Sequence, residues 1–120
     1  MTGNCAGVRK RTMNASTREQ RGITIVDVTG DIDMGTSPGL RKMLLEALKK
    51  TSRLVVNLRE VRYVDSSGIA SLVEVLKEAR NKEKRLILFG LNNAVQEVLQ
   101  LTRLSKIFEI RETEEEALQA

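Results

Sequence analysis

The chain has 120 residues, of which 41% are apolar, enough to bury one hydrophobic core and form one domain. Its aromatic residues are Tyr63, Phe89 and Phe108, too few for a surface that stacks successive bases. The net charge of +4 resides in residues 1–21, where five basic residues accompany one acidic residue, and residues 22–120 hold fifteen of each sign. The basicity therefore says little about the partners of the domain.

The first 21 residues are polar, lack the apolar segment of a signal peptide and show neither a helical nor an alternating pattern. We expect 1–21 to be a flexible basic leader and 22–120 to form the domain. Met13 is an alternative start that would remove the basic cluster at 9–11. Three charges in a flexible segment are usually only solvated, so no direct nucleic-acid partner is predicted.

The first half of the domain contains signals for strands and one helix. Residues 23–29 are rich in β-branched side chains, and the pattern resumes after Gly30 at 31–33, which predicts two strands or one bent pair. Thr36, Ser37 and Pro38 begin a helix whose apolar residues recur at helical spacing up to Leu48. Residues 54–58 are continuously apolar, which is typical of a strand buried on both faces.

The second half alternates helices and strands. A second helix is predicted from Ser66 or Ser67 to about residue 80, and Asn92 or Asn93 can cap a third. Residues 86–89 and 107–110 are predicted strands, and 114–118 a last short helix. Such alternation requires helical crossovers between parallel strands. The predicted fold class is α/β, with a mixed, mostly parallel sheet of about five strands packed against amphipathic helices.

Several classes of function are disfavoured by what the chain lacks. Its longest apolar run, 86–89, is far shorter than the roughly 20 residues that span a bilayer. Cys5 is the single cysteine and there is no histidine, so a cytoplasmic protein without metal, cofactor or enzymatic activity is predicted. Residues 30–37 partly match the glycine spacing of a phosphate-binding loop but lack the lysine that contacts the phosphates. We therefore interpret them as an exposed turn.

The sequence Asp65-Ser66-Ser67-Gly68 lies where a strand is predicted to lead into the second helix. A serine hydroxyl there can cap the free N–H groups of the first turn. The same helix start can also accept a phosphoryl group, because it carries a partial positive charge. Chemistry alone leaves both interpretations open: a structural cap and a phosphorylation site.

Three segments together resemble the STAS domain family, and within it the anti-sigma-factor antagonists. They are the turn Gly30-Asp31-Ile32-Asp33, the segment Tyr63-Val64-Asp65-Ser66-Ser67-Gly68-Ile69, and the late run 101–108. The resemblance covers about residues 22–118. It implies a partner switch that binds an anti-sigma factor with serine kinase activity, and so frees the sigma factor. That kinase phosphorylates the switch, and a serine phosphatase reverses the modification.

The resemblance also assigns residues. The implied phosphoacceptor is Ser66, with Asp33 and Asp65 orienting its hydroxyl or contacting the kinase, and Ser67 as the helix cap. The implied partner-binding residues are Asp33, Met34, Gly35, Thr36, Ser37, Asp65, Ser66, Ser67 and Gly68. The alternative is a STAS subunit of a membrane transport or lipid-trafficking system without sigma-factor regulation. Members of that second group often lack a serine after the aspartate.

Overall fold

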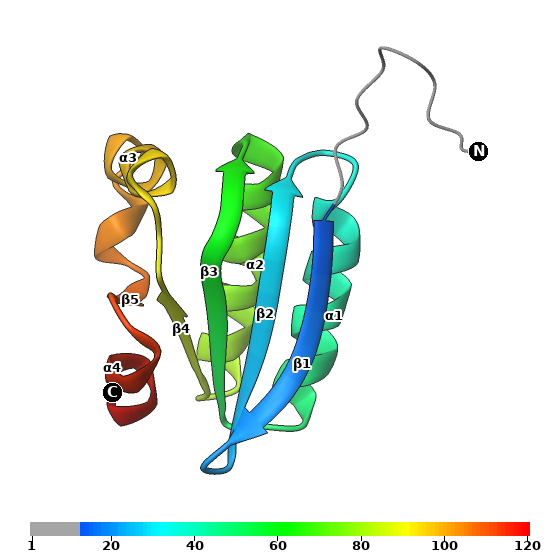
Figure 1. The fold of residues 1–120 in the computed structure, drawn as a ribbon. Coiled ribbons are helices and arrows are strands. Elements are labelled where there is room, and N and C mark those ends of the chain that lie inside the picture. The colour runs from blue at the N-terminus through cyan, green and yellow to red at the C-terminus, as the bar shows by residue number, and fades with distance from the viewer. Residues whose placement is uncertain (1–12) are drawn as a thin grey trace, which may run out of the picture.

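A computed structural model describes residues 13–120, which form a five-stranded mixed sheet with strand order β1-β2-β3-β4-β5 (Figure 1). The strands are β1 (Met13–Gln20), β2 (Ile23–Ile32), β3 (Arg53–Val64), β4 (Arg85–Phe89) and β5 (Glu109–Arg111). The helices are α1 (Ser37–Lys49), α2 (Ser66–Asn81), α3 (Asn93–Leu101), the 3-10 turn η1 (Leu104–Lys106) and α4 (Glu114–Gln119). Strands β2 to β5 are parallel and β1 is antiparallel to β2, which confirms the predicted α/β class.

The predicted flexible leader is wrong for residues 13–20, because they form β1. This strand pairs with β2 along its whole length, from Met13 opposite Gly30 to Gln20 opposite Ile23. Arg21 and Gly22, both at positive φ, make the tight turn between the two strands. An edge strand exposed on much of its surface needs few apolar residues, so its composition resembled a linker. The basic cluster at 9–11 and Cys5 lie outside the described residues.

Two other strands differ from their predicted bounds. The signals at 23–29 and 31–33 belong to one strand, β2, which has register shifts against β3 at Asp27/Thr29 and Gly30/Asp31. Gly30 adopts φ +96, a value that L side chains rarely take, and so permits the second shift. Strand β3 continues beyond the predicted 54–58 to Val64, which brings it directly to the start of α2.

The two faces of the sheet are covered unequally. Helices α1 and α2 lie side by side on one face (Figure 1), and Val95 and Leu99 of α3 join the same large core cluster. The other face carries a smaller cluster in which Ala117 and Leu118 of α4 pack on strand residues such as Phe89. The connection that positions the start of α2 is therefore anchored on the side with the main core.

Candidate functional site

The carboxyl ends of β2 and β3 meet at one edge of the sheet, where α2 begins (Figure 1). The N–H of Asp65 donates a hydrogen bond to the carbonyl oxygen of Ile32, at 3.0 Å. Because this bond joins the last residue of β2 to the residue after β3, it brings the loop that starts at Asp33 next to the start of α2. The structure thus brings together the two segments that the sequence predicts to form a site.

Asp65, not Ser67, caps α2. Its backbone is extended (φ −97, ψ −172), and its Oδ1 accepts a hydrogen bond from the N–H of Gly68 at 3.0 Å. Ser66 is the first helical residue and is exposed, while Ser67 is partly buried. Among residues 13–120, no hydrogen bond involves the Ser66 hydroxyl. The expected hydrogen bond from this hydroxyl to Asp33 or Asp65 is therefore not formed within residues 13–120. The hydroxyl is available to a partner.

Gly68 fixes how closely α2 approaches the sheet. A Cβ atom at this position would lie 2.7 Å from Cγ2 of Ile32 and 2.8 Å from Cγ1 of Val64, closer than real contacts allow. Gly68 is buried, and its close packing supports the start of α2, while its contact with a partner stays a prediction.

The loop at 33–36 is held by its own hydrogen bonds. Oδ1 of Asp33 accepts from the N–H groups of Gly35 and Thr36, at 2.9 and 3.1 Å. The Thr36 hydroxyl donates to the carbonyl of Asp31 at 2.8 Å and accepts from the N–H of Asp33 at 2.9 Å. These bonds make Asp33 an organiser of the loop. The interpretation of residues 30–37 as a turn is confirmed for 33–36, whereas 30–32 belong to β2 and Ser37 begins α1.

The predicted partner-binding residues differ in exposure. Met34 is 75% exposed and Gly35 is exposed, whereas Ser37 is only 3% exposed. Tyr63, which the sequence placed in the motif but not in the contact set, is 42% exposed. Exposed Met and Tyr side chains are typical of a protein-binding surface.

A groove of about 270 Å³ begins at this surface and runs between α1 and α2. It is lined by Met34, Ser37, Pro38, Arg41, Ser67, Ala70, Ser71 and Glu74. The residues beyond Ser37 in α1 and beyond Gly68 in α2 were not predicted as site residues. Only the packing of the two helices shows that they face a common groove.

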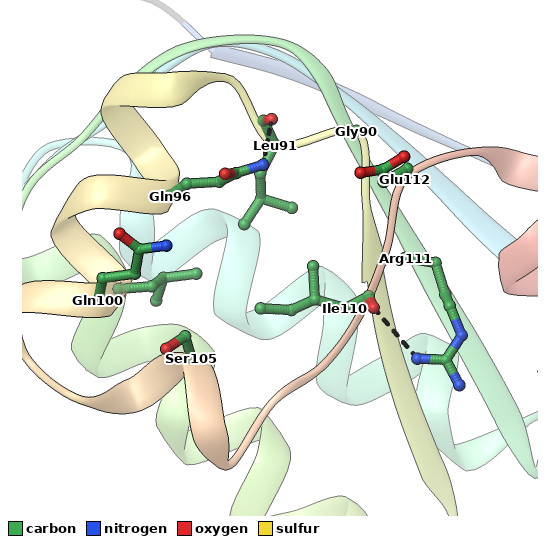
Figure 2. A pocket seen from close by; sticks show the side chains of 9 residues that line it. Gly90, Leu91, Gln96, Gln100, Ser105, Ile110, Arg111 and Glu112 are labelled. Carbon is green, nitrogen blue, oxygen red and sulfur yellow. Dashed lines mark hydrogen bonds between the residues drawn. The ribbon is translucent and has the colours of Figure 1, made fainter.

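A larger hollow of about 480 Å³ lies between α3 and the ends of β4 and β5 (Figure 2). Its lining residues come from α3, from η1 and from the carboxyl ends of β4 and β5 with the residues that follow them. Its polar side chains are partly engaged with the backbone: Gln96 donates to the carbonyl of Leu91 and Arg111 to that of Ile110. None of the residues implicated at the start of α2 lines this hollow.

The shifted pKa values occur on the opposite face of the sheet, around Arg18 of β1. Its guanidinium binds Asp27, with Nε 2.7 Å from Oδ2, and Glu114 of α4, with Nη2 2.5 Å from Oε1. Nδ2 of Asn57 also donates to Asp27, at 2.8 Å. Hydrogen bonds from Arg18 hold the pKa of both Asp27 and Glu114 below their ordinary values. We call Arg18, Asp27, Asn57 and Glu114 the Arg18 cluster.

None of the helices within residues 13–120 combines the length and apolar composition needed to cross a membrane. In the same part of the chain, no three Cys, His, Asp or Glu side chains gather in a way that could hold a metal ion.

Comparison with known proteins identifies the family. The model of the STAS domain matches residues 14–117, from β1 into α4. The chain belongs to the STAS domain family. Because the match begins at residue 14, it agrees with placing β1 inside the domain.

The similar proteins include anti-sigma-factor antagonists and a member of a transporter family. A protein named anti-sigma-B factor antagonist from Listeria monocytogenes is 36% identical over 90 residues, covering 74% of this chain and 79% of the relative. The crystal structure of an anti-sigma factor antagonist from Mycobacterium paratuberculosis has a TM-score of 0.83 at 26% identity, covering 90% and 92% of the two chains. A sulfate transporter family protein from Wolinella succinogenes has a TM-score of 0.72 at 18% identity, covering 83% and 84%. That last likeness concerns the fold alone.

Proposed function

We infer that this STAS protein is an anti-sigma-factor antagonist that acts as a phosphorylation-controlled partner switch in the cytoplasm. Its unphosphorylated form binds an anti-sigma factor with serine kinase activity, and the bound sigma factor is released. Phosphorylation of Ser66 by that kinase blocks binding, and a serine phosphatase restores it. The name of the relative from Listeria monocytogenes supports the class of function.

The observation that carries this proposal is the position of the Ser66 hydroxyl. It is exposed on the first residue of α2 and takes no part in capping, because Asp65 does that. Phosphorylation would therefore break no hydrogen bond among residues 13–120. The helix N-terminus would stabilise the added negative charge by about 0.3–2 kcal/mol.

A phosphoryl group on Ser66 would affect partner binding more strongly than it affects folding. A phosphate dianion enclosed between two proteins without a matching cation loses its hydration, which costs several kcal/mol. Since about 1.4 kcal/mol is a tenfold change in affinity, this cost removes a micromolar partner. The exposed Met34, which lines a groove together with Ser67, would lie within such an interface. Phosphorylation would then control binding while the domain stays folded.

A phosphorylation assay tests the proposal. The protein is incubated with ATP and each anti-sigma-factor kinase of its source bacterium, and the modified residue is mapped by mass spectrometry. One kinase is expected to modify Ser66, and Ser66→Ala to remain unmodified. Ser67→Ala is the matched control, because it changes the neighbouring serine on the same turn and should still be modified. Full modification of Ser66→Ala at another residue would contradict the assignment.

The alternative function is that of a subunit of a transport or lipid-trafficking system. Such subunits share the STAS fold, so the fold does not distinguish them from partner switches. The exposed Ser66 favours the switch, because a fixed structural subunit has no use for an acceptor hydroxyl at this position. In the assay above, a transport subunit is expected to remain unmodified by every kinase and to bind none of them.

A further inference from the structure

The groove between α1 and α2 extends the surface around Ser66 along both helices. Met34, at its mouth, is 75% exposed, and Ser67, next to the proposed phosphoacceptor, lines it as well. Pro38 and Arg41 follow on the α1 side, with Ala70 and Glu74 on the α2 side. Ser66, Ala70 and Glu74 are spaced four residues apart, so they form one stripe on the surface of α2.

An ion pair bridges the two helices at this groove. Nη1 of Arg41 donates to Oε1 of Glu74 at 2.7 Å, and the two side chains remain 41% and 56% exposed. Exposed ion pairs contribute little to folding stability, because water screens the attraction and two long side chains lose mobility. The apolar contacts between α1 and α2 already hold these helices together. Stability of the domain therefore gives little reason for this pair.

The pair lies within reach of any protein that covers Ser66. Glu74 follows Ser66 by eight residues, which is about 12 Å along a helix axis. A stable interface buries roughly 800 Å² on each partner, a patch roughly 30 Å across. A partner centred on Ser66 therefore also covers the Arg41–Glu74 pair.

We propose that the Arg41–Glu74 pair selects which anti-sigma factor binds. The cognate factor places an acidic side chain against Arg41 and a basic side chain against Glu74, and a factor with the opposite order of charges is rejected. Charges at the rim of an interface act mainly on specificity, since like charges brought together strongly disfavour the wrong partner. This inference rests on the proposed function and names the residues that would give it selectivity.

A charge swap tests the selection without removing the ion pair. The double variant Arg41→Glu with Glu74→Arg retains a bridge between the same helices, so its Tm is expected within about 4 °C of the wild type. Its Kd for the kinase that binds the wild type, measured by titration calorimetry, is expected to rise at least about tenfold.

The matched control is the ion pair between Glu78 of α2 and Lys82, the C-cap residue of that helix, whose charged atoms are 3.0 Å apart. Glu78 lies about 18 Å along the helix from Ser66, outside a patch centred on that residue. The swap Glu78→Lys with Lys82→Glu is expected to change Kd less than twofold. If the first swap lowers Tm by more than expected, Arg41→Gln, which removes only the cation, provides the same comparison.

The outcomes separate the two proposals. Equal binding by the Arg41/Glu74 swap and the Glu78/Lys82 swap overturns the selection and leaves the partner switch in place. Failure of the wild type to bind any of the kinases overturns the partner switch and the selection with it.

Discussion

The start of α2 and the Arg18 cluster are both polar, but they are built in opposite ways. At the start of α2 the side-chain hydrogen bonds are local: Asp65 binds Gly68 and Asp33 binds Thr36, each three residues away. In the Arg18 cluster, Arg18 binds Asp27 nine residues away and Glu114 ninety-six residues away. The local bonds leave the Ser66 hydroxyl unused, whereas the distant bonds engage both carboxylates and join α4 to the sheet.

This difference indicates that one region of the domain serves folding and the other serves partner binding. The long-range ion pair that joins α4 to β1 lies on the face of the smaller core cluster, away from the surface proposed for partner binding. A modification at Ser66 can then alter one surface while the distant contacts keep the sheet intact. Substitutions in each region measure how far that region contributes to folding and to binding.

The largest expected effect on stability comes from Gly68, where the site meets the core. Gly68→Ala puts a Cβ atom 2.7 Å from Cγ2 of Ile32, so either α2 or the end of β2 must move. We expect the free energy of unfolding to fall by about 1–3 kcal/mol, measured by urea denaturation. Retained stability would mean that the start of α2 is loosely held, which contradicts the packing described here.

Gly39 offers a matched control for this substitution. It lies in α1, and a Cβ atom there meets nothing within 4 Å. Gly39→Ala is expected to raise stability by about 0.5–1 kcal/mol, because alanine loses less backbone entropy than glycine in a helix. Opposite signs for the two variants would separate packing from helix propensity.

The next effect concerns the Arg18 cluster. Arg18→Met keeps part of the apolar stem but leaves Asp27 and Glu114 without their shared cation. The Arg18 side chain is 38% exposed, so solvent screening reduces the loss, and we expect about 1–2 kcal/mol by urea denaturation. Partner binding should stay within twofold of the wild type if this region serves folding alone.

The same cluster predicts a dependence on pH. Arg18 holds the pKa of Asp27 and of Glu114 below their ordinary values of 3.8 and 4.5. The stabilisation is therefore present above those ordinary values and is lost as the pH falls through the lowered ones. Between about pH 5 and pH 3, wild-type stability should fall more steeply than that of Arg18→Met. Parallel curves would mean that the bonds from Arg18 do not affect these carboxylates.

Features that depend on contacts between residues close in the sequence could be predicted, and features that depend on distant contacts could not. The start of α2 was predicted within a residue, because a strand signal, cap residues and helical spacing all lie within a few positions. The cap itself was assigned to Ser67 rather than Asp65. Asp and Ser are about equally good caps, and only the backbone geometry decides between them.

Strand β1 and the groove could not be predicted in this way. The signal that makes residues 13–20 a strand is their pairing with β2, together with the contact of Arg18 with Glu114. A pattern of charges within 1–21 cannot reveal a partner ninety-six residues away. The pairing of Arg41 with Glu74 likewise depends on how α1 packs on α2.

A smaller effect is expected at the cap of α2. Asp65→Ala removes the acceptor for the N–H of Gly68, and we expect a loss of about 1 kcal/mol, measured by thermal and urea denaturation. Asp65→Asn keeps an oxygen acceptor and should preserve stability. If Asp65→Asn nevertheless weakens binding to the kinase, the carboxylate charge has a role in recognition beyond capping.

The smallest effect on stability, and the largest on binding, is expected at Ser66. Ser66→Glu places a negative charge at the first position of α2, where the helix dipole favours it, so stability should change by less than about 0.5 kcal/mol. Kinase affinity, measured by titration calorimetry, should fall at least about tenfold, because the charge would be enclosed in the interface. Ser67→Glu, on the partly buried neighbour, is the control for charge on the same turn and should weaken binding less. A large loss of stability in Ser66→Glu with unchanged binding would assign Ser66 to the fold, and the contrast between the two regions would fail.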